Sequence, residues 1–219
     1  MIKNSCHSLI IGGTGQLGIT LLKQLNKKNK KVIITSRFKK SIIKKKQFEI
    51  VVLDIFNKKK ISKLIKKYKP QNIFYFAGQS SPSISFVKKN ETLRSNYIGC
   101  KNVLESIYKI DTNISFFYAA SCEMYGKIKG KISLKSKKNP INPYGLAKLK
   151  GFNITKLYRE KHNLKTYNAI LFNTESILRD KSFFIPKICM AAINAYRFNL
   201  KTPFGNIDIK KEWNWCSDQ

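Results

Sequence analysis

The chain has 219 residues, of which 42% are hydrophobic and 12% aromatic, a composition that excludes a disordered protein and supports one core with a small second lobe. No apolar run approaches the roughly 18 residues that span a membrane. The net charge of +31 is compatible with a polyanion partner. However, only 5 of the 43 basic residues are Arg, the residue suited to reading nucleic-acid grooves, so we favour a compositional lysine bias over nucleic-acid binding.

Strand-like and helix-like segments alternate along the chain. Strands are predicted at 8–11, 32–34, 49–53, 73–77, 114–119 and 166–172, and helices at 19–29, 61–68, 96–110 and from 143 onward. This alternation predicts an α/β fold, a Rossmann-like doubly wound parallel sheet with helices on both faces. The pattern loosens past Asn173. We therefore expect a Rossmann domain over residues 1–172 and an incomplete C-terminal lobe over residues 173–219.

Cysteine and histidine usage bears on compartment and metal binding. The five cysteines are odd in number and form no Cys-x-x-Cys pair, which favours a reduced, cytoplasmic compartment. With only two histidines and no Cys/His cluster, we expect no metal site.

A glycine-rich turn lies between the first predicted strand and the first predicted helix. It reads Gly12-Gly13-Thr14-Gly15-Gln16-Leu17-Gly18. Glycine at 12, 15 and 18 lets the backbone turn tightly and approach a pyrophosphate, which binds the N–H groups of the helix start. At this junction the turn predicts dinucleotide binding rather than a plain glycine-rich connection.

Two residues at later strand ends bear on the cofactor. Where an NAD-selective domain would have an acid for the ribose, this chain has Ser36-Arg37, and an Arg can bind the 2′-phosphate of NADP. The alternative is a solvated surface Arg. Asp54, after the third strand, could contact the adenine or simply cap the chain from Ile55, and both interpretations stay open.

Tyr144 and Lys148 lie four residues apart and so share one helix face. A lysine held near a tyrosine hydroxyl favours the phenolate, which lets the tyrosine exchange protons near neutral pH. The spacing alone is weak evidence. Ser121 and Glu123, which lie 23 and 21 residues upstream of the tyrosine, make it more specific.

With the glycine turn and the Tyr-x-x-x-Lys motif together, the chain resembles the extended short-chain dehydrogenase/reductases, and within them the GDP-mannose 4,6-dehydratase family. The stretches that carry this resemblance, over essentially the whole chain, are 76–80, 121–127, 142–148, 171–176 and 204–213. The resemblance implies a hydro-lyase that oxidises C4 of GDP-mannose or a similar sugar nucleotide, eliminates water across C5 and C6, and returns hydride to C6. It also implies NADP as cofactor and a homo-oligomer, either dimer or tetramer.

The resemblance also implies roles for individual residues. Tyr144 would take the C4 hydroxyl proton, Lys148 would hold the nicotinamide ribose, and Ser121 would donate a hydrogen bond to the C4 oxygen. Glu123 would act as base at C5 and as acid for the C6 hydroxyl. A plain epimerase or reductase needs no such group, and with only 12 acids in the chain a chance surface Glu here is improbable. The remaining implied contacts are Ala77 and Gln79 with the cofactor, and Ser80, Asn173, Glu175, Arg179 and Lys187 with the substrate.

Some residues depart from the family pattern. Residues 175–179 read Glu-Ser-Ile-Leu-Arg where Glu-Ser-Pro-Arg-Arg is usual, and the chain stops at Gln219 where family members continue. Because basic residues are so abundant in this chain, Arg179 and Lys187 could instead be ordinary charged surface residues that do not contact the substrate.

Two other functions stay open. One is an NADP-dependent sugar-nucleotide epimerase or 4-keto-reductase, and the other is a truncated, non-catalytic basic binding protein on the same scaffold.

Overall fold

The computed structural model describes residues 6–38, 48–128, 130–204, 208 and 211–218. Contacts divide the chain after Leu171 into two compact units, Met1–Leu171 and Phe172–Gln219. Part of the 204–213 stretch that resembles the dehydratase family, namely residues 205–207, 209 and 210, lies outside the described residues.

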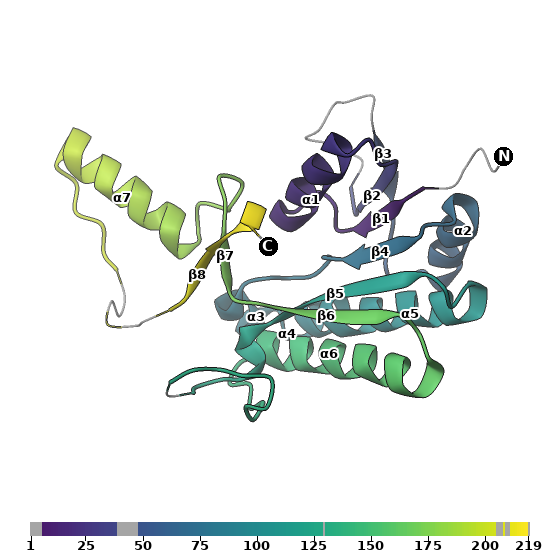
Figure 1. Ribbon diagram of the computed structural model, residues 1–219. Helices are drawn as coiled ribbons and strands as arrows, with labels where there is room; N and C mark the ends of the chain where they lie inside the picture. Colours follow the sequence, from purple (N-terminus) through teal and green to yellow (C-terminus); the bar gives the residue numbers. More distant parts are fainter. Residues whose placement is uncertain (1–5, 39–47, 129, 205–207, 209–210, 219) are drawn as a thin grey trace. The chain divides into compact units, whose positions relative to one another are not determined.

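The first unit is a six-stranded parallel sheet with the strand order β3-β2-β1-β4-β5-β6 (Figure 1). Its elements in chain order are β1 (Ser8–Ile11), α1 (Gln16–Lys27), β2 (Val32–Ser36), β3 (Phe48–Val52), α2 (Lys58–Tyr68), β4 (Asn72–Tyr75), α3 (Pro82–Val87), α4 (Lys89–Leu93), a π-helix (Arg94–Ile98), α5 (Gly99–Ile110), β5 (Ser115–Ser121), a 3₁₀ helix (Cys122–Met124), α6 (Pro143–His162) and β6 (Thr166–Leu171). The central strand β1 pairs with two neighbours, so that Ser8 is opposite both Val32 and Asn72. The predicted doubly wound parallel sheet is confirmed.

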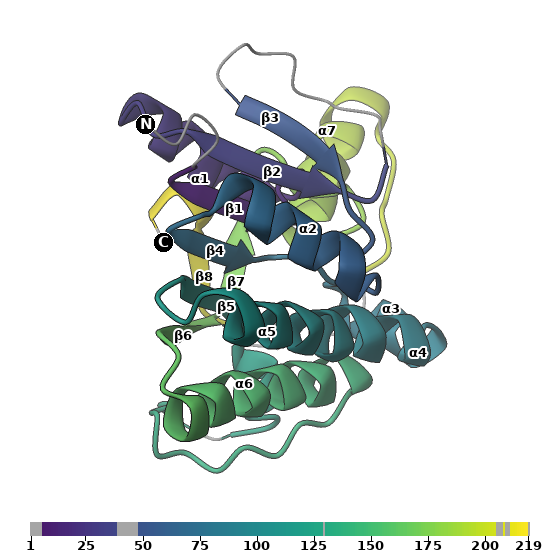
Figure 2. The ribbon, with the colours of Figure 1, turned by 90° about the vertical axis from the view of Figure 1, so that its right-hand side faces the viewer.

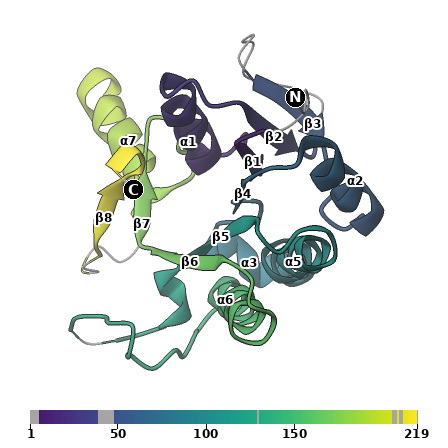
Figure 3. The same cartoon turned by 45° about the vertical axis from the view of Figure 1, so that its right-hand side comes forward.

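Helices cover both faces of this sheet. Helix α1 lies on one face, whereas α2, α5 and α6 lie side by side on the other (Figures 2 and 3). On the face of α2 and α5, Leu9, Ile11, Ile33, Val103 and Phe116 are almost completely buried. Burial of such side chains, at roughly 25 cal/mol per Å² of apolar surface, is the main stabilising contribution to this unit.

The opposite face carries a ladder of aromatic rings across neighbouring strands. The rings of Phe74 and Phe117 stack with centroids 4.7 Å apart, and those of Phe117 and Tyr167 stack at 4.8 Å. Offset-stacked rings on adjacent strands add to the energy of area burial, so this ladder ties β4, β5 and β6 together.

The second unit contains a short sheet and one long helix. Strand β7 (Asn173–Glu175) pairs in parallel with β8 (Trp213–Trp215), and helix α7 spans Phe184–Phe198. All residues of α7 are described and none of them is buried. The ring of Phe184 stacks on that of Trp213, with centroids 5.9 Å apart. Among the described helices of both units, none has the length and apolar character needed to cross a membrane.

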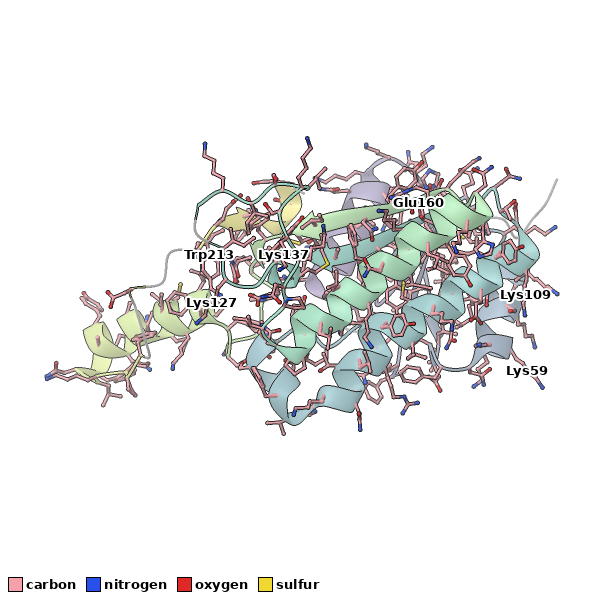
Figure 4. All side chains as sticks on the ribbon, turned by 90° about the horizontal axis from the view of Figure 1, so that it is seen from below. Lys59, Lys109, Lys127, Lys137, Glu160 and Trp213 are labelled. Atoms are coloured by element: carbon pink, nitrogen blue, oxygen red, sulfur yellow. The ribbon has the colours of Figure 1, made fainter. Side chains whose placement is uncertain are left out.

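Most of the described lysines lie on the surface. Lys59, Lys109, Lys127 and Lys137 are exposed, and Figure 4 shows Lys59 and Lys109 at the outer edge of the molecule. A long charged side chain in this position keeps its ammonium group hydrated. Among the lysines that the structure describes, Lys148 is buried, and it lies in the candidate site.

Candidate functional site

The predicted site residues of the first unit follow the carboxyl ends of its strands. Gly12 follows β1, Arg37 follows β2, Ala77 follows β4 by two residues, and Ser121 ends β5. The strand order reverses direction between β1 and β4. In open α/β sheets ligands bind outside the carboxyl ends of the strands at such a reversal. The topology therefore brings the predicted cofactor and catalytic residues to one edge of the sheet.

The three motif glycines differ in what a side chain would meet. At Gly12 the backbone has φ +82°, and a Cβ atom would overlap the backbone of Ala77; at Gly18 it would overlap Gly13. At Gly15, by contrast, the nearest neighbour would be the Gly12 carbonyl oxygen at 3.5 Å, an ordinary contact. Two glycines thus permit the tight turn and the packing of α1, and the third leaves space at the helix start.

The start of α1 suits a phosphate group. Its N-cap is the exposed Gly15, which has no side chain to cap the helix, and its first turn carries no acidic residue. The N–H groups and the positive end of the helix dipole favour an anion there. Thr14, Gln16 and Leu17 are half-buried around this turn. The residues present fit the diphosphate of a dinucleotide.

Arg37 and Asp54 have local partners in the structure. The exposed Arg37 guanidinium lies 3.4 Å from the carboxylate of Glu91 on α4. An exposed pair of this kind is worth at most about 1 kcal/mol, so it leaves the guanidinium able to exchange partners. Asp54 Oδ1 accepts the N–H of Phe56 at 2.9 Å, which is the local cap considered from the sequence. Its contact with adenine stays a prediction.

Gln79 connects the loop after β4 to the helices that follow. Its Nε2 donates to the Ser81 carbonyl at 2.8 Å, and its Oε1 accepts from the Thr92 hydroxyl at 3.3 Å. This structural role was not predicted. Ala77 is half-buried against Gly12, and Ser80 is exposed.

Ser121 and Glu123 lie at the turn that ends β5. The Ser121 Oγ accepts the N–H of Glu123 at 3.3 Å and so caps the 3₁₀ helix Cys122–Met124. The Glu123 Oε2 in turn accepts a hydrogen bond from Asn142 Nδ2 at 2.7 Å. The two predicted catalytic groups are thus adjacent; one hydrogen bond lies within the turn, and the other comes from Asn142, 19 residues further along the chain.

Tyr144 and Lys148 lie one turn apart at the start of α6. The N–H of Tyr144 donates to the buried Ser85 Oγ at 3.1 Å. The buried Lys148 Nζ donates to the Ala119 carbonyl at 2.7 Å and lies 5.6 Å from the centroid of the Tyr144 ring. Burial lowers the pKa of Lys148 from 10.5 to about 8, because the charged form is desolvated.

Close packing joins the pair Ser121 and Glu123 to the pair Tyr144 and Lys148. A Cβ atom at Gly145 would overlap the carbonyl oxygen of Glu123, so the start of α6 rests directly on the 3₁₀ turn. The structure therefore gathers all four predicted catalytic residues from β5, the 3₁₀ helix and α6. Three supporting residues were missed: Ser85, Asn142 and Gly145. Asn142 precedes a Pro at a helix start, a capping signal that the sequence does contain.

The thiols of the first unit are unsuited to nucleophilic chemistry where they are buried. Burial raises the pKa of Cys6 to about 11 and that of Cys100 to about 12, so both stay protonated near neutral pH. Cys122, beside Ser121, is half-buried. In the described part of the chain no three His, Cys, Asp or Glu side chains gather as metal ligands would.

Two of the four predicted substrate residues of the second unit, Glu175 and Arg179, contact each other. Asn173 Nδ2 donates to the Glu212 carbonyl at 2.8 Å. Glu175 is buried, and its Oε1 lies 3.7 Å from Arg179 Nε. Burial raises the pKa of Glu175, and the charge of Arg179 opposes that rise. The Arg179 guanidinium also lies 3.6 Å from the centroid of the Phe183 ring, so it is not a solvated surface group, whereas Lys187 is exposed.

Comparisons with known proteins identify relatives of this chain. Residues 9–219 match the model of a family described as GDP-mannose 4,6 dehydratase. The GDP-mannose 4,6 dehydratase of Drosophila melanogaster is 31% identical over 169 residues, which cover 75% of this chain and 43% of that protein. The human GDP-mannose 4,6 dehydratase is 32% identical over 161 residues, which cover 71% of this chain and 43% of that protein. The chain thus spans less than half the length of these curated relatives.

Solved structures share the fold at lower identity. A UDP-glucose 4-epimerase from Thermotoga maritima, solved with UDP-glucose, superposes with a TM-score of 0.85 at 19% identity, covering 97% of this chain and 70% of that one. A dTDP-glucose 4,6-dehydratase from Streptomyces venezuelae, solved with NAD and TYD bound, gives 0.85 at 18% identity, with 97% and 69% coverage.

Proposed function

Because the chain belongs to the GDP-mannose 4,6-dehydratase family, we propose that it converts GDP-mannose to GDP-4-keto-6-deoxymannose with NADP as cofactor. The observation that carries this proposal is the cluster of Ser121, Glu123, Tyr144 and Lys148 at the end of β5 and the start of α6. Glu123 is the decisive member, since oxidation at C4 alone requires no second acid/base group.

The residues around α1 would hold the cofactor. Gly12, Gly15 and Gly18 make room for its diphosphate at the helix start, and Arg37 would meet the 2′-phosphate that distinguishes NADP from NAD. When bound, NADP supplies the hydride acceptor for C4 and the hydride donor for C6. Lys148 would hold the nicotinamide ribose.

The proton transfers are assigned to side chains of this chain. The Tyr144 phenolate takes the C4 hydroxyl proton, and the ammonium group of Lys148, charged below a pKa of about 8, stabilises that phenolate. The Ser121 hydroxyl donates a hydrogen bond to the C4 oxygen. The Glu123 carboxylate takes the C5 proton and returns it to the C6 hydroxyl, which leaves as water. When hydride returns to C6, C5 takes up the proton that Tyr144 accepted from the C4 hydroxyl, so that protons balance over the whole reaction.

A product assay tests the proposal. The purified chain is incubated with GDP-mannose and NADP, and mass spectrometry is expected to detect a product lighter by one water, without net reduction of the cofactor. Glu123→Gln should abolish this product, because the amide cannot take the C5 proton. Glu160→Gln, at an exposed position of α6 labelled in Figure 4, is the matched control and should stay active.

The other outcomes separate the alternatives. Product formation that survives Glu123→Gln would contradict the proposal, and an epimerised or reduced sugar would indicate an epimerase or 4-keto-reductase. A chain that binds no NADP but retains RNA in a salt-sensitive manner would be a basic binding protein.

A further inference from the structure

The side-chain amide of Asn142 makes two hydrogen bonds, one as acceptor and one as donor. Its Oδ1 accepts the N–H of Gly145 at 2.7 Å, which caps the N-terminus of α6. Its Nδ2 donates to Glu123 Oε2, also at 2.7 Å. One amide group therefore connects the first turn of the helix that carries Tyr144 and Lys148 to the carboxylate of Glu123.

Few side chains can make this connection. Ser and Asp cap helices as well as Asn does, but an ionised Asp has no donor and a Ser hydroxyl has only one proton on a shorter side chain. The planar amide places a donor and an acceptor on the same rigid group. The contact between Gly145 and the Glu123 carbonyl fixes the two backbones as well, so both ends of the connection are held.

The helix itself favours a carboxylate at this point. Helix α6 is 20 residues long and has no acidic residue in its first turn. The carboxylate of Glu123, bonded to the N-cap side chain, supplies the negative charge that a helix N-terminus attracts. The helix dipole and the hydrogen bond from Asn142 therefore both favour placement of the Glu123 carboxylate at the start of α6.

We propose that Asn142 is a positioning residue that holds the Glu123 carboxylate at a fixed distance from the helix carrying Tyr144 and Lys148. This inference rests on the proposed function. Asn142 thereby fixes the position of Glu123, which transfers the C5 and C6 protons, relative to Tyr144, which takes the C4 hydroxyl proton. Fixed placement matters because a displacement of about 1 Å can lower a rate up to about 100-fold.

The structure separates this role from the placement of Tyr144. The backbone N–H of Tyr144 bonds to Ser85 of α3, and Lys148 bonds to Ala119 of β5, so neither contact uses the Asn142 amide. Loss of the Nδ2 donor should therefore slow the elimination of water while C4 oxidation continues. A purely structural role of Asn142 would slow both steps together.

The test compares Asn142→Ser, which keeps a capping oxygen, with Asn57→Ser, which makes the same change at the N-cap of α2. For Asn142→Ser we expect product formation to fall by about 10- to 100-fold, the KM for GDP-mannose to stay within about twofold, and reduced cofactor to accumulate during turnover. Asn57→Ser should leave turnover unchanged. An equal loss of both steps, or wild-type turnover in Asn142→Ser, would overturn the positioning role.

A double-mutant cycle of unfolding midpoints tests the hydrogen bond between Asn142 and Glu123 without relying on activity. The unfolding midpoints of Asn142→Ser, Glu123→Ala and the double variant should be non-additive, because either single change removes the same hydrogen bond. Additive midpoints would overturn the connection. Coupled midpoints in a chain with no dehydratase activity would instead overturn the proposed function, and the positioning role with it, while the hydrogen bond itself would stand.

Discussion

Replacing the buried Lys148 with Met should change how the stability of the protein depends on pH. Burial lowers the pKa of Lys148 from 10.5 to about 8 in the folded protein, which corresponds to about 3 kcal/mol at about 1.4 kcal/mol per pH unit. Below pH 8 both folded and unfolded chains hold the proton, and the folded state bears the full cost of the buried charge. Between pH 8 and 10.5 only the unfolded chain still holds it, so stability rises with pH.

The assay is urea unfolding, followed by circular dichroism, of the wild-type chain and Lys148→Met at several values between pH 7 and 10. The other lysines titrate in both proteins, so their contribution cancels in the difference between the two free energies of unfolding. This difference, wild type minus variant, should increase by about 1.4 kcal/mol for each pH unit above pH 8. Loss of the Lys148 hydrogen bond to Ala119 adds a constant offset and does not affect the slope.

Parallel curves for the two proteins would refute the reasoning, since they would mean that Lys148 titrates alike in the folded and unfolded chains. Lys150→Met, at an exposed position of the same helix, controls for the loss of one positive charge. A slope of the opposite sign would show that the folded state stabilises the ammonium group instead of destabilising it.

Two further changes examine the packing of the site and its cofactor selectivity. Gly145→Ala should lower the free energy of unfolding by about 1–3 kcal/mol and reduce product formation, because the added methyl group overlaps the Glu123 carbonyl oxygen. Thermal unfolding and the product assay check this, and an unchanged midpoint would contradict it. Arg37→Ser should raise the Kd for NADP about tenfold or more while leaving that for NAD nearly unchanged, measured by fluorescence titration. Equal weakening for both cofactors would contradict an Arg37 contact with the 2′-phosphate.

The sheet could be predicted because its strands are short apolar runs between turns. Strand β1, for example, is buried at every position and is followed directly by the glycine turn. The predicted helix at 96–110 is helical throughout, with residues 96–98 in the π-helix Arg94–Ile98 and the rest in α5. The prediction began this helix too late, because α4 leads directly into the π-helix. Helix α3 was missed, since its six residues are fewer than two turns and too short to show a helical period.

In the second unit, the helix itself was not predicted from the sequence, since the region past Asn173 was interpreted only as a lobe with a loosened pattern. None of the residues of α7 is buried, and Phe184, Ile193, Tyr196 and Phe198 are all exposed.

In the site, sequence reasoning found the reactive groups but not their supports. Glu123 and Tyr144 stand out by residue type and spacing, whereas the bond between Glu123 and Asn142 joins positions 19 residues apart on different elements. The burial of Lys148 could not be foreseen either, because a chain with so many lysines gives no signal of which positions are buried.

The two tryptophans of the chain, Trp213 and Trp215, both lie on β8. Tryptophan emission therefore reports on the smaller unit alone, while the circular dichroism signal comes chiefly from the helices of the larger one. In a single denaturant titration the two signals follow different parts of the molecule. Coincident transitions would show that the units unfold together, and separate ones would give each unit its own stability.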